Sequence, residues 1–99
     1  MTITNQQDGT VLTMTIEGRI DTQTSPELDQ AILALPEDIT ELILDFTQVI
    51  YISSAGLRSV LTAQNKMNSK NGNMIIRGAA KNIVGVFKVT GFDTFLTLE

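Results

Sequence analysis

The stretch Tyr51–Arg58, which reads Tyr-Ile-Ser-Ser-Ala-Gly-Leu-Arg, decides how the rest of this chain is organised. It joins a strand-like run, Glu41–Phe46, to a helix-like run that begins near Ala55. Two adjacent hydroxyls, Ser53 and Ser54, therefore stand where the helix is expected to start. These two serines are the candidate functional site of the sequence.

The N-terminal half predicts two strands followed by a helix. Val11–Glu17 alternates apolar and polar side chains, as a strand buried on one face does. Asp8–Gly9 before it is a hairpin turn signal. Thr24 and Glu27 have the spacing of a capping box, which predicts a helix start, and Pro36 ends the helical pattern. In chain order we expect an edge strand at Thr2–Asn5, a strand at Val11–Glu17 that Gly18–Asp21 leaves, and a helix from Thr24 to Leu35.

The C-terminal half alternates strands and helices. Leu42–Leu44 is short and continuously apolar, which favours a central strand covered on both faces, and Asp45–Gln48 is expected to leave it. Gly91 stands where a glycine ends a helix. We expect a helix after the serine pair up to the stop signal at Asn71–Asn73, a strand at Met74–Ile76, a helix containing Ile83–Phe87, and a last strand at Phe95–Leu98.

The element order β-β-α-β-α-β-α-β predicts an α/β fold: a single domain over residues 1–99, with a mixed β-sheet and helices mainly on one side. A chain of 99 residues suits one hydrophobic core. If the strands near 11–17, 41–46 and 73–77 are parallel, their carboxyl ends share one edge. We then expect Asp21, the Ser53–Ser54 pair and the Gly78–Lys81 loop at that edge, where open α/β sheets bind ligands and partners.

Composition excludes several classes of function. The chain has no cysteine and no histidine, which removes thiolate or imidazole metal sites and Ser-His-Asp catalysis. The formal net charge is −4 and the seven cations are scattered, so we expect no direct nucleic-acid binding. No apolar run approaches the roughly 20 residues of a membrane span, and the N-terminus lacks a secretion signal. The expected location is the cytoplasm, without membrane insertion, metal or cofactor.

The serine pair supports two interpretations. A serine at a helix start commonly caps unpaired N–H groups and does nothing else. A phosphate at the same place would be stabilised by the positive helix end and would add about 1.5 to 2 negative charges. Gly56, in the first turn of the expected helix, indicates either tight packing of helix on strand or close approach of a partner to the backbone. Asp21, in turn, has the sequence context of an ordinary turn residue.

The stretch Asp45–Arg58 resembles the signature of STAS domains, and specifically of stand-alone anti-sigma factor antagonists. Gly18–Asp21 is similar to the second motif of that family, on the loop that faces the phosphorylation site. Gly72–Met74 and Val89–Phe92 match weaker landmarks at suitable spacing. The resemblance covers nearly the whole chain and implies a bacterial signal-transduction protein that regulates transcription.

The resemblance implies that Ser54 is reversibly phosphorylated by an ATP-using serine/threonine kinase that is also an anti-sigma factor. The unphosphorylated form would bind this kinase and free the sigma factor, and a PPM-type phosphatase would reset the phosphorylated form. The family often has aspartate before the modified serine and serine or threonine after it. Here Ser53 and Ala55 stand at those positions, which makes Ser53 the second candidate. The implied partner-binding residues are Asp21, Ser53, Ser54, Gly56, Leu57 and Arg58.

Two alternatives stay open on sequence grounds. In the first, the domain is a STAS adaptor that binds a protein partner without a phosphorylation cycle, in a signalling assembly or beside a transporter. The other alternative is an enzyme with Ser54 as nucleophile, which we do not favour. A nucleophilic serine needs a base, and no histidine and no adjacent lysine or carboxylate is available. The sequence does not indicate an oligomeric state.

Overall fold

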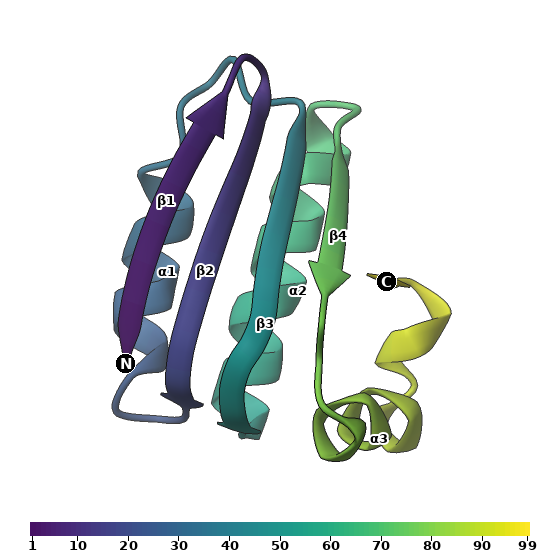
Figure 1. Ribbon diagram of the computed structural model, residues 1–99. Helices are drawn as coiled ribbons and strands as arrows, with labels where there is room; N and C mark the ends of the chain where they lie inside the picture. Colours follow the sequence, from purple (N-terminus) through teal and green to yellow (C-terminus); the bar gives the residue numbers. More distant parts are fainter.

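Five strands form one sheet in the order β1-β2-β3-β4-β5, with three α-helices between them (Figure 1). The computed structural model describes all residues, Met1–Glu99. The strands are β1 (Thr2–Asp8), β2 (Val11–Ile20), β3 (Glu41–Ile52), β4 (Asn73–Arg77) and β5 (Thr97–Leu98). The helices are α1 (Ser25–Leu33), α2 (Ser54–Ser69), α3 (Lys81–Thr90) and the short 3₁₀ helix η1 (Phe92–Thr94).

The sheet is mixed, as the sequence predicts. β1 and β2 form an antiparallel hairpin, and Gly9 takes a positive φ of 63° in the turn between them. The pairs β2–β3, β3–β4 and β4–β5 are all parallel. The carboxyl ends of β2 and β3 therefore lie at the same edge of the sheet, at the bottom of Figure 1.

Both α1 and α2 pack on one face of the sheet, and α3 lies beyond the end of β4 (Figure 1). Alternate residues of β2 point into the core under these helices, so Leu12, Met14 and Ile16 are all buried. The opposite face carries no helix. Ile43 on that face is only half-buried, so the expectation of a central strand covered on both faces is wrong. The run Leu42–Leu44 alternates between core and open face.

The strand β3 continues well beyond the predicted exit at Asp45–Gln48. Its register against β2 shifts twice, between Thr15 and Glu17 and again between Gly18 and Arg19. Each shift lets β3 accommodate an extra residue, as a β-bulge does. The bulges change which side chains face the core, so Val49 and Ile52 are buried although two exposed residues precede each of them.

Helix ends follow the predicted signals, except that the capping box is absent. Thr24 occupies the N-cap position of α1, but its hydroxyl donates to the Arg19 carbonyl at 2.7 Å and caps no helix N–H group. Gly91 ends α3 with a φ of 79°, as expected. The last strand covers only Thr97–Leu98 of the predicted Phe95–Leu98, because the backbone N–H groups of Phe95 and Leu96 donate to the Phe92 carbonyl in the turn that follows η1. None of the helices combines the length and the apolar character needed to cross a bilayer.

We predict that Asp45, at the first bulge, stabilises the fold only while it is ionised. The Thr47 hydroxyl, the Thr47 backbone N–H group at 3.0 Å and the Arg77 guanidinium at 3.3 Å hold the pKa of Asp45 below its ordinary 3.8. A lowered folded-state pKa contributes stability above 3.8, and this is lost as pH falls through the folded value. Asp45→Asn should lower the free energy of unfolding by about 1 kcal/mol at neutral pH.

The stability deficit of Asp45→Asn should shrink towards zero as pH falls from 3.8 through the lower folded-state pKa of Asp45. Urea unfolding at neutral and acid pH measures this change. Asp38→Asn is the control, because the exposed Asp38 forms no ion pair or hydrogen bond through its side chain. An Asp45→Asn deficit that stays constant with pH would contradict this role for Asp45.

Candidate functional site

The N-terminus of α2 lies against the loop that follows β2. The Ser53 backbone N–H donates to the Ile20 carbonyl at 2.9 Å, and Ile20 pairs with Ile52 at the ends of the two strands. Asp21 and Ser54 therefore lie at the same edge of the sheet, as the parallel topology predicts. Gly78, which opens the loop after β4, lies beside Thr47 of β3, because a β-carbon on Gly78 would be 2.9 Å from Thr47 Cγ2. The chain then runs to α3 at the edge where β2 and β3 end (Figure 1).

The two adjacent hydroxyls have different surroundings. Ser53 is the N-cap of α2, and its Oγ accepts a hydrogen bond from the Gly56 backbone N–H at 3.3 Å. Ser53 is half-buried, whereas Ser54 is exposed at the first helical position and its hydroxyl makes no hydrogen bond within the protein. The sequence allowed either serine to be the helix cap, and the structure shows that Ser53 is the cap. The hydroxyl of Ser54 is accessible to another molecule.

Gly56 holds the first turn of α2 close to the sheet. A β-carbon at this position would lie 2.7 Å from Ile52 Cγ1 and 2.8 Å from both Ile20 Cγ2 and the Ile20 carbonyl oxygen. Leu57 beside it is also buried, with 7% of its surface exposed. Of the two interpretations of Gly56, the structure supports tight helix–strand packing. Both residues support the candidate surface from beneath and do not form it.

Asp21 organises its own turn. One carboxylate oxygen, Oδ1, accepts hydrogen bonds from the backbone N–H groups of Gln23 at 3.0 Å and Thr24 at 3.1 Å. The other, Oδ2, lies 3.6 Å from Arg19 Nε. These contacts, above all the backbone bond from Thr24, hold the pKa of Asp21 below its ordinary value. The carboxylate is therefore ionised at neutral pH and fixes the loop beside the serine pair.

An exposed aromatic and apolar surface adjoins this loop, and the sequence did not single it out. Tyr51 is 40% exposed and Ile50 is 63% exposed at the end of β3. The Arg19 guanidinium lies 4.3 Å from the centre of the Tyr51 ring, within cation–π range. Arg19 and Tyr51 pair across the strands only because of the second bulge, which could not be located in the sequence.

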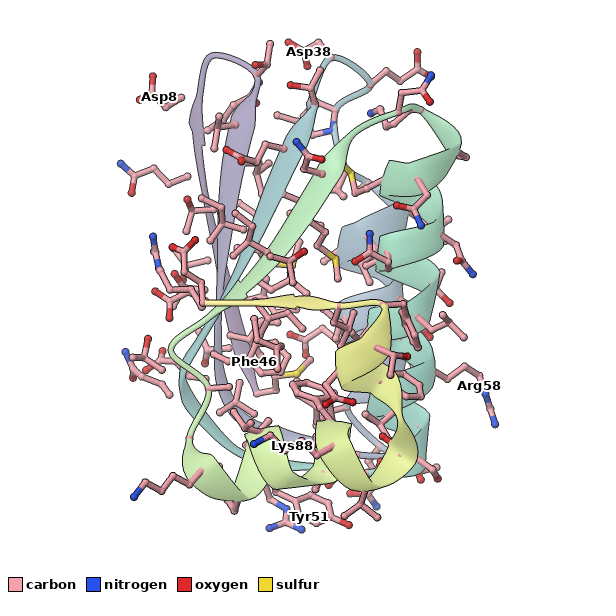
Figure 2. All side chains as sticks on the ribbon, turned by 90° about the vertical axis from the view of Figure 1, so that its right-hand side faces the viewer. Asp8, Asp38, Phe46, Tyr51, Arg58 and Lys88 are labelled. Atoms are coloured by element: carbon pink, nitrogen blue, oxygen red, sulfur yellow. The ribbon has the colours of Figure 1, made fainter.

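Arg58 completes the set of predicted residues. It is exposed on α2, and its side chain extends away from the helix into solvent (Figure 2). We use the name serine edge for the exposed residues Arg19, Tyr51, Ser54 and Arg58 together with the half-buried Asp21 and Ser53.

The one cleft in the protein lies elsewhere. It has a volume of about 370 Å³ and lies beside the C-terminal half of α2, at the other end of the helix from Ser54. Its lining consists of Gln64, Asn68, Gly72, Asn73, Met74, Ile75, Phe95 and Thr97. No residue of the serine edge lines this cleft.

The mixed five-stranded sheet with helices on one face makes this protein a small α/β domain. The sequence identifies its family. The chain belongs to the STAS domain family, because the family profile described as "Mlab, STAS domain" matches residues 3–98. A curated relative, the anti-sigma-B factor antagonist of Listeria monocytogenes, is 24% identical over 86 residues. This match covers 85% of the present chain and 75% of the relative.

Solved structures share the fold over almost the whole chain. An anti-sigma factor antagonist from Mycobacterium paratuberculosis is 28% identical, with a TM-score of 0.80, and the match covers 98% of this chain and 83% of that one. The anti-sigma factor antagonist SpoIIAA in its unphosphorylated form has a TM-score of 0.72 at 16% identity, covering 99% and 87% of the two chains. SpoIIAA from Bacillus has also been solved in its phosphorylated form, with a TM-score of 0.70 and coverage of 99% and 91%.

We predict that Gly56→Ala destabilises the protein, because the added methyl group would overlap two isoleucine side chains and a backbone carbonyl. Overpacking of this kind lowers the free energy of unfolding by about 2 kcal/mol. Gly85→Ala in α3 is the matched control, because nothing lies within 4 Å of its β-carbon position. This variant should be more stable than wild type by about 1 kcal/mol, since alanine is the better helix former.

Urea unfolding of both variants measures the difference. Equal stability of Gly56→Ala and wild type would show that the first turn of α2 is not clamped to β2 and β3.

Proposed function

We propose that this protein is an anti-sigma factor antagonist whose binding to an anti-sigma factor serine/threonine kinase is switched off by phosphorylation of Ser54. A PPM-type phosphatase would restore the binding form. The kinase would transfer the γ-phosphoryl group of ATP to the Ser54 hydroxyl, with ADP leaving and the hydroxyl proton passing to solvent. The protein itself supplies no catalytic group in this proposal, and it acts in the bacterial cytoplasm.

The observation that carries the proposal is the position of Ser54. Its hydroxyl is exposed and free of hydrogen bonds, and it lies in the stretch that matches the family motif. Ser53 is the poorer acceptor of a phosphoryl group, because it is half-buried and its oxygen caps the helix through the Gly56 N–H. The proposal therefore assigns the modification to Ser54 and the capping function to Ser53.

A phosphate on Ser54 would act as a switch without unfolding the domain. The first turn of α2 contains no acidic residue, so the unpaired N–H groups at the helix start can stabilise the added negative charge. A partner that fits the neutral hydroxyl at the exposed start of α2 would meet a bulky, strongly hydrated anion instead. Placing such an anion in an interface is opposed by desolvation and steric overlap, so affinity falls while the fold persists.

The cation–π contact between Arg19 and Tyr51 suggests how the kinase would be held before Ser54 is modified. Tyrosine and arginine are the residue types that contribute most to protein interfaces, and Tyr51 and Arg19 are already stacked in the free protein. A preformed arrangement loses less side-chain entropy on binding. We therefore include Arg19 and Tyr51 in the proposed docking surface, because Arg19 is paired with Asp21 at the same edge of the sheet as Ser54.

We predict that a kinase fraction from the native host, supplied with ATP, adds one phosphate to the wild-type protein and none to Ser54→Ala. Ser53→Ala should still be labelled. It should lose about 1 kcal/mol of stability, because the helix N-cap is removed. Ser54→Ala should keep wild-type stability, because the Ser54 hydroxyl has no partner inside the protein. Mass spectrometry of the phosphopeptide and urea unfolding measure the two effects.

Labelling that persists in Ser54→Ala and disappears in Ser53→Ala would move the site to Ser53. The absence of any phosphate on either serine, both in this reaction and in protein isolated from the host, would favour the adaptor without a phosphorylation cycle.

A further inference from the structure

Arg58 is the one charged residue of the serine edge whose side chain makes no ion pair in the unmodified protein. It lies four residues after Ser54 on α2, and residues at this spacing are neighbours on a helix surface. Both residues are exposed, and Arg58 extends into solvent (Figure 2). Unlike Arg19 and Arg77, Arg58 forms no ion pair with a carboxylate. A free guanidinium therefore lies one helical turn from the exposed hydroxyl.

We infer that Arg58 is a positioning residue that pairs with the phosphate on Ser54 in the modified protein. This inference rests on the proposed function, because it concerns the phosphorylated state of the same serine. The planar guanidinium has several N–H donors and can bind two phosphate oxygens at once. The helix start supplies further N–H groups from the other side. The phosphate is thereby held against α2 instead of pointing freely into solvent.

The pairing changes what the serine edge offers to a partner. In the unmodified protein Arg58 is a free cation beside a neutral hydroxyl, available to a carboxylate of the partner. In the modified protein the same guanidinium is occupied by the phosphate. Phosphorylation therefore adds an anion and also removes a cationic contact, so one modification alters two features of the docking surface.

The neighbouring charged groups do not offer the phosphate an equivalent partner. Arg19 is stacked on Tyr51 and paired with Asp21, and all three belong to β2, β3 or the loop between β2 and α1. Releasing Arg19 would break a cation–π contact and an ion pair. Arg58 has no such contact to lose, which favours it as the group that responds to the phosphate.

The test uses the full chain with phosphoserine incorporated at position 54 during synthesis, so that no kinase is needed. Phosphorus NMR follows the second ionisation of the phosphate, which lies near pH 6 in a free phosphoserine. Arg58→Gln should raise this pKa by about 0.3 pH unit relative to the phosphorylated wild type, a twofold change that corresponds to about 0.4 kcal/mol for an exposed helical ion pair. Arg19→Gln, which removes the same charge from β2, should shift the value by less than half as much.

A second measurement follows the Arg58 side-chain Nε–H signal, which should move on phosphorylation and return towards its original position at high salt. The inference is overturned if Arg58→Gln leaves the phosphate pKa unchanged, if Arg19→Gln shifts it equally, or if the Arg58 signal does not respond. These results are independent of whether Ser54 is modified in the host. Failure of the proposed function would instead appear as an unphosphorylated serine in protein isolated from the host.

Discussion

The contact between Gly56 and the ends of β2 and β3 determines the geometry of the serine edge. A glycine here lets the first turn of α2 approach Ile20 and Ile52 more closely than any residue with a β-carbon could, given the distances of 2.7 and 2.8 Å. The same approach brings the Ser53 N–H group within 2.9 Å of the Ile20 carbonyl. The helix start and the loop after β2 are therefore joined by packing and by a backbone hydrogen bond.

This clamp gives the two serines different surroundings. Because the helix is held close to the sheet, Ser53 is half-buried and its oxygen satisfies the Gly56 N–H group. Ser54 follows at the first helical position and faces solvent. The helix end tolerates a negative charge at that position, and the clamp beneath it does not involve the Ser54 side chain. A modification of Ser54 can therefore alter the surface while the core is unaffected.

The overall architecture was predictable because it depends on local patterns. The stop at Asn71–Asn73 and the glycine at Gly91 each correspond to a helix end in the structure. The strict alternation predicted β2, although the strand runs to Ile20 and not only to Glu17. The extension of β3 was not predictable, because its bulges replace the period of two with a spacing of three between Phe46, Val49 and Ile52. The short η1 that follows Gly91 was likewise not predicted.

The candidate site was only partly predictable, for a related reason. The parallel topology predicts that Asp21 and Ser54 share an edge, and they do. The direction of the Asp21 carboxylate depends on hydrogen bonds to Gln23 and Thr24, which the sequence reports only as a turn-like composition. The contact of Arg19 with Tyr51 depends on a strand register that no local pattern specifies. Long-range register and side-chain direction thus required the structure.

The proposed switch requires that a phosphate on Ser54 blocks partner binding while the domain stays folded. The decisive measurement is calorimetric titration of the partner, purified from the native host by its affinity for the unmodified protein, with unmodified and phosphorylated chains. Circular dichroism of both chains controls for folding.

The account predicts identical circular dichroism and a loss of about 3 kcal/mol in binding free energy on phosphorylation, which is a roughly hundredfold weaker affinity. Equal affinity of the two forms for the partner would contradict it, even if Ser54 proves to be the modified residue.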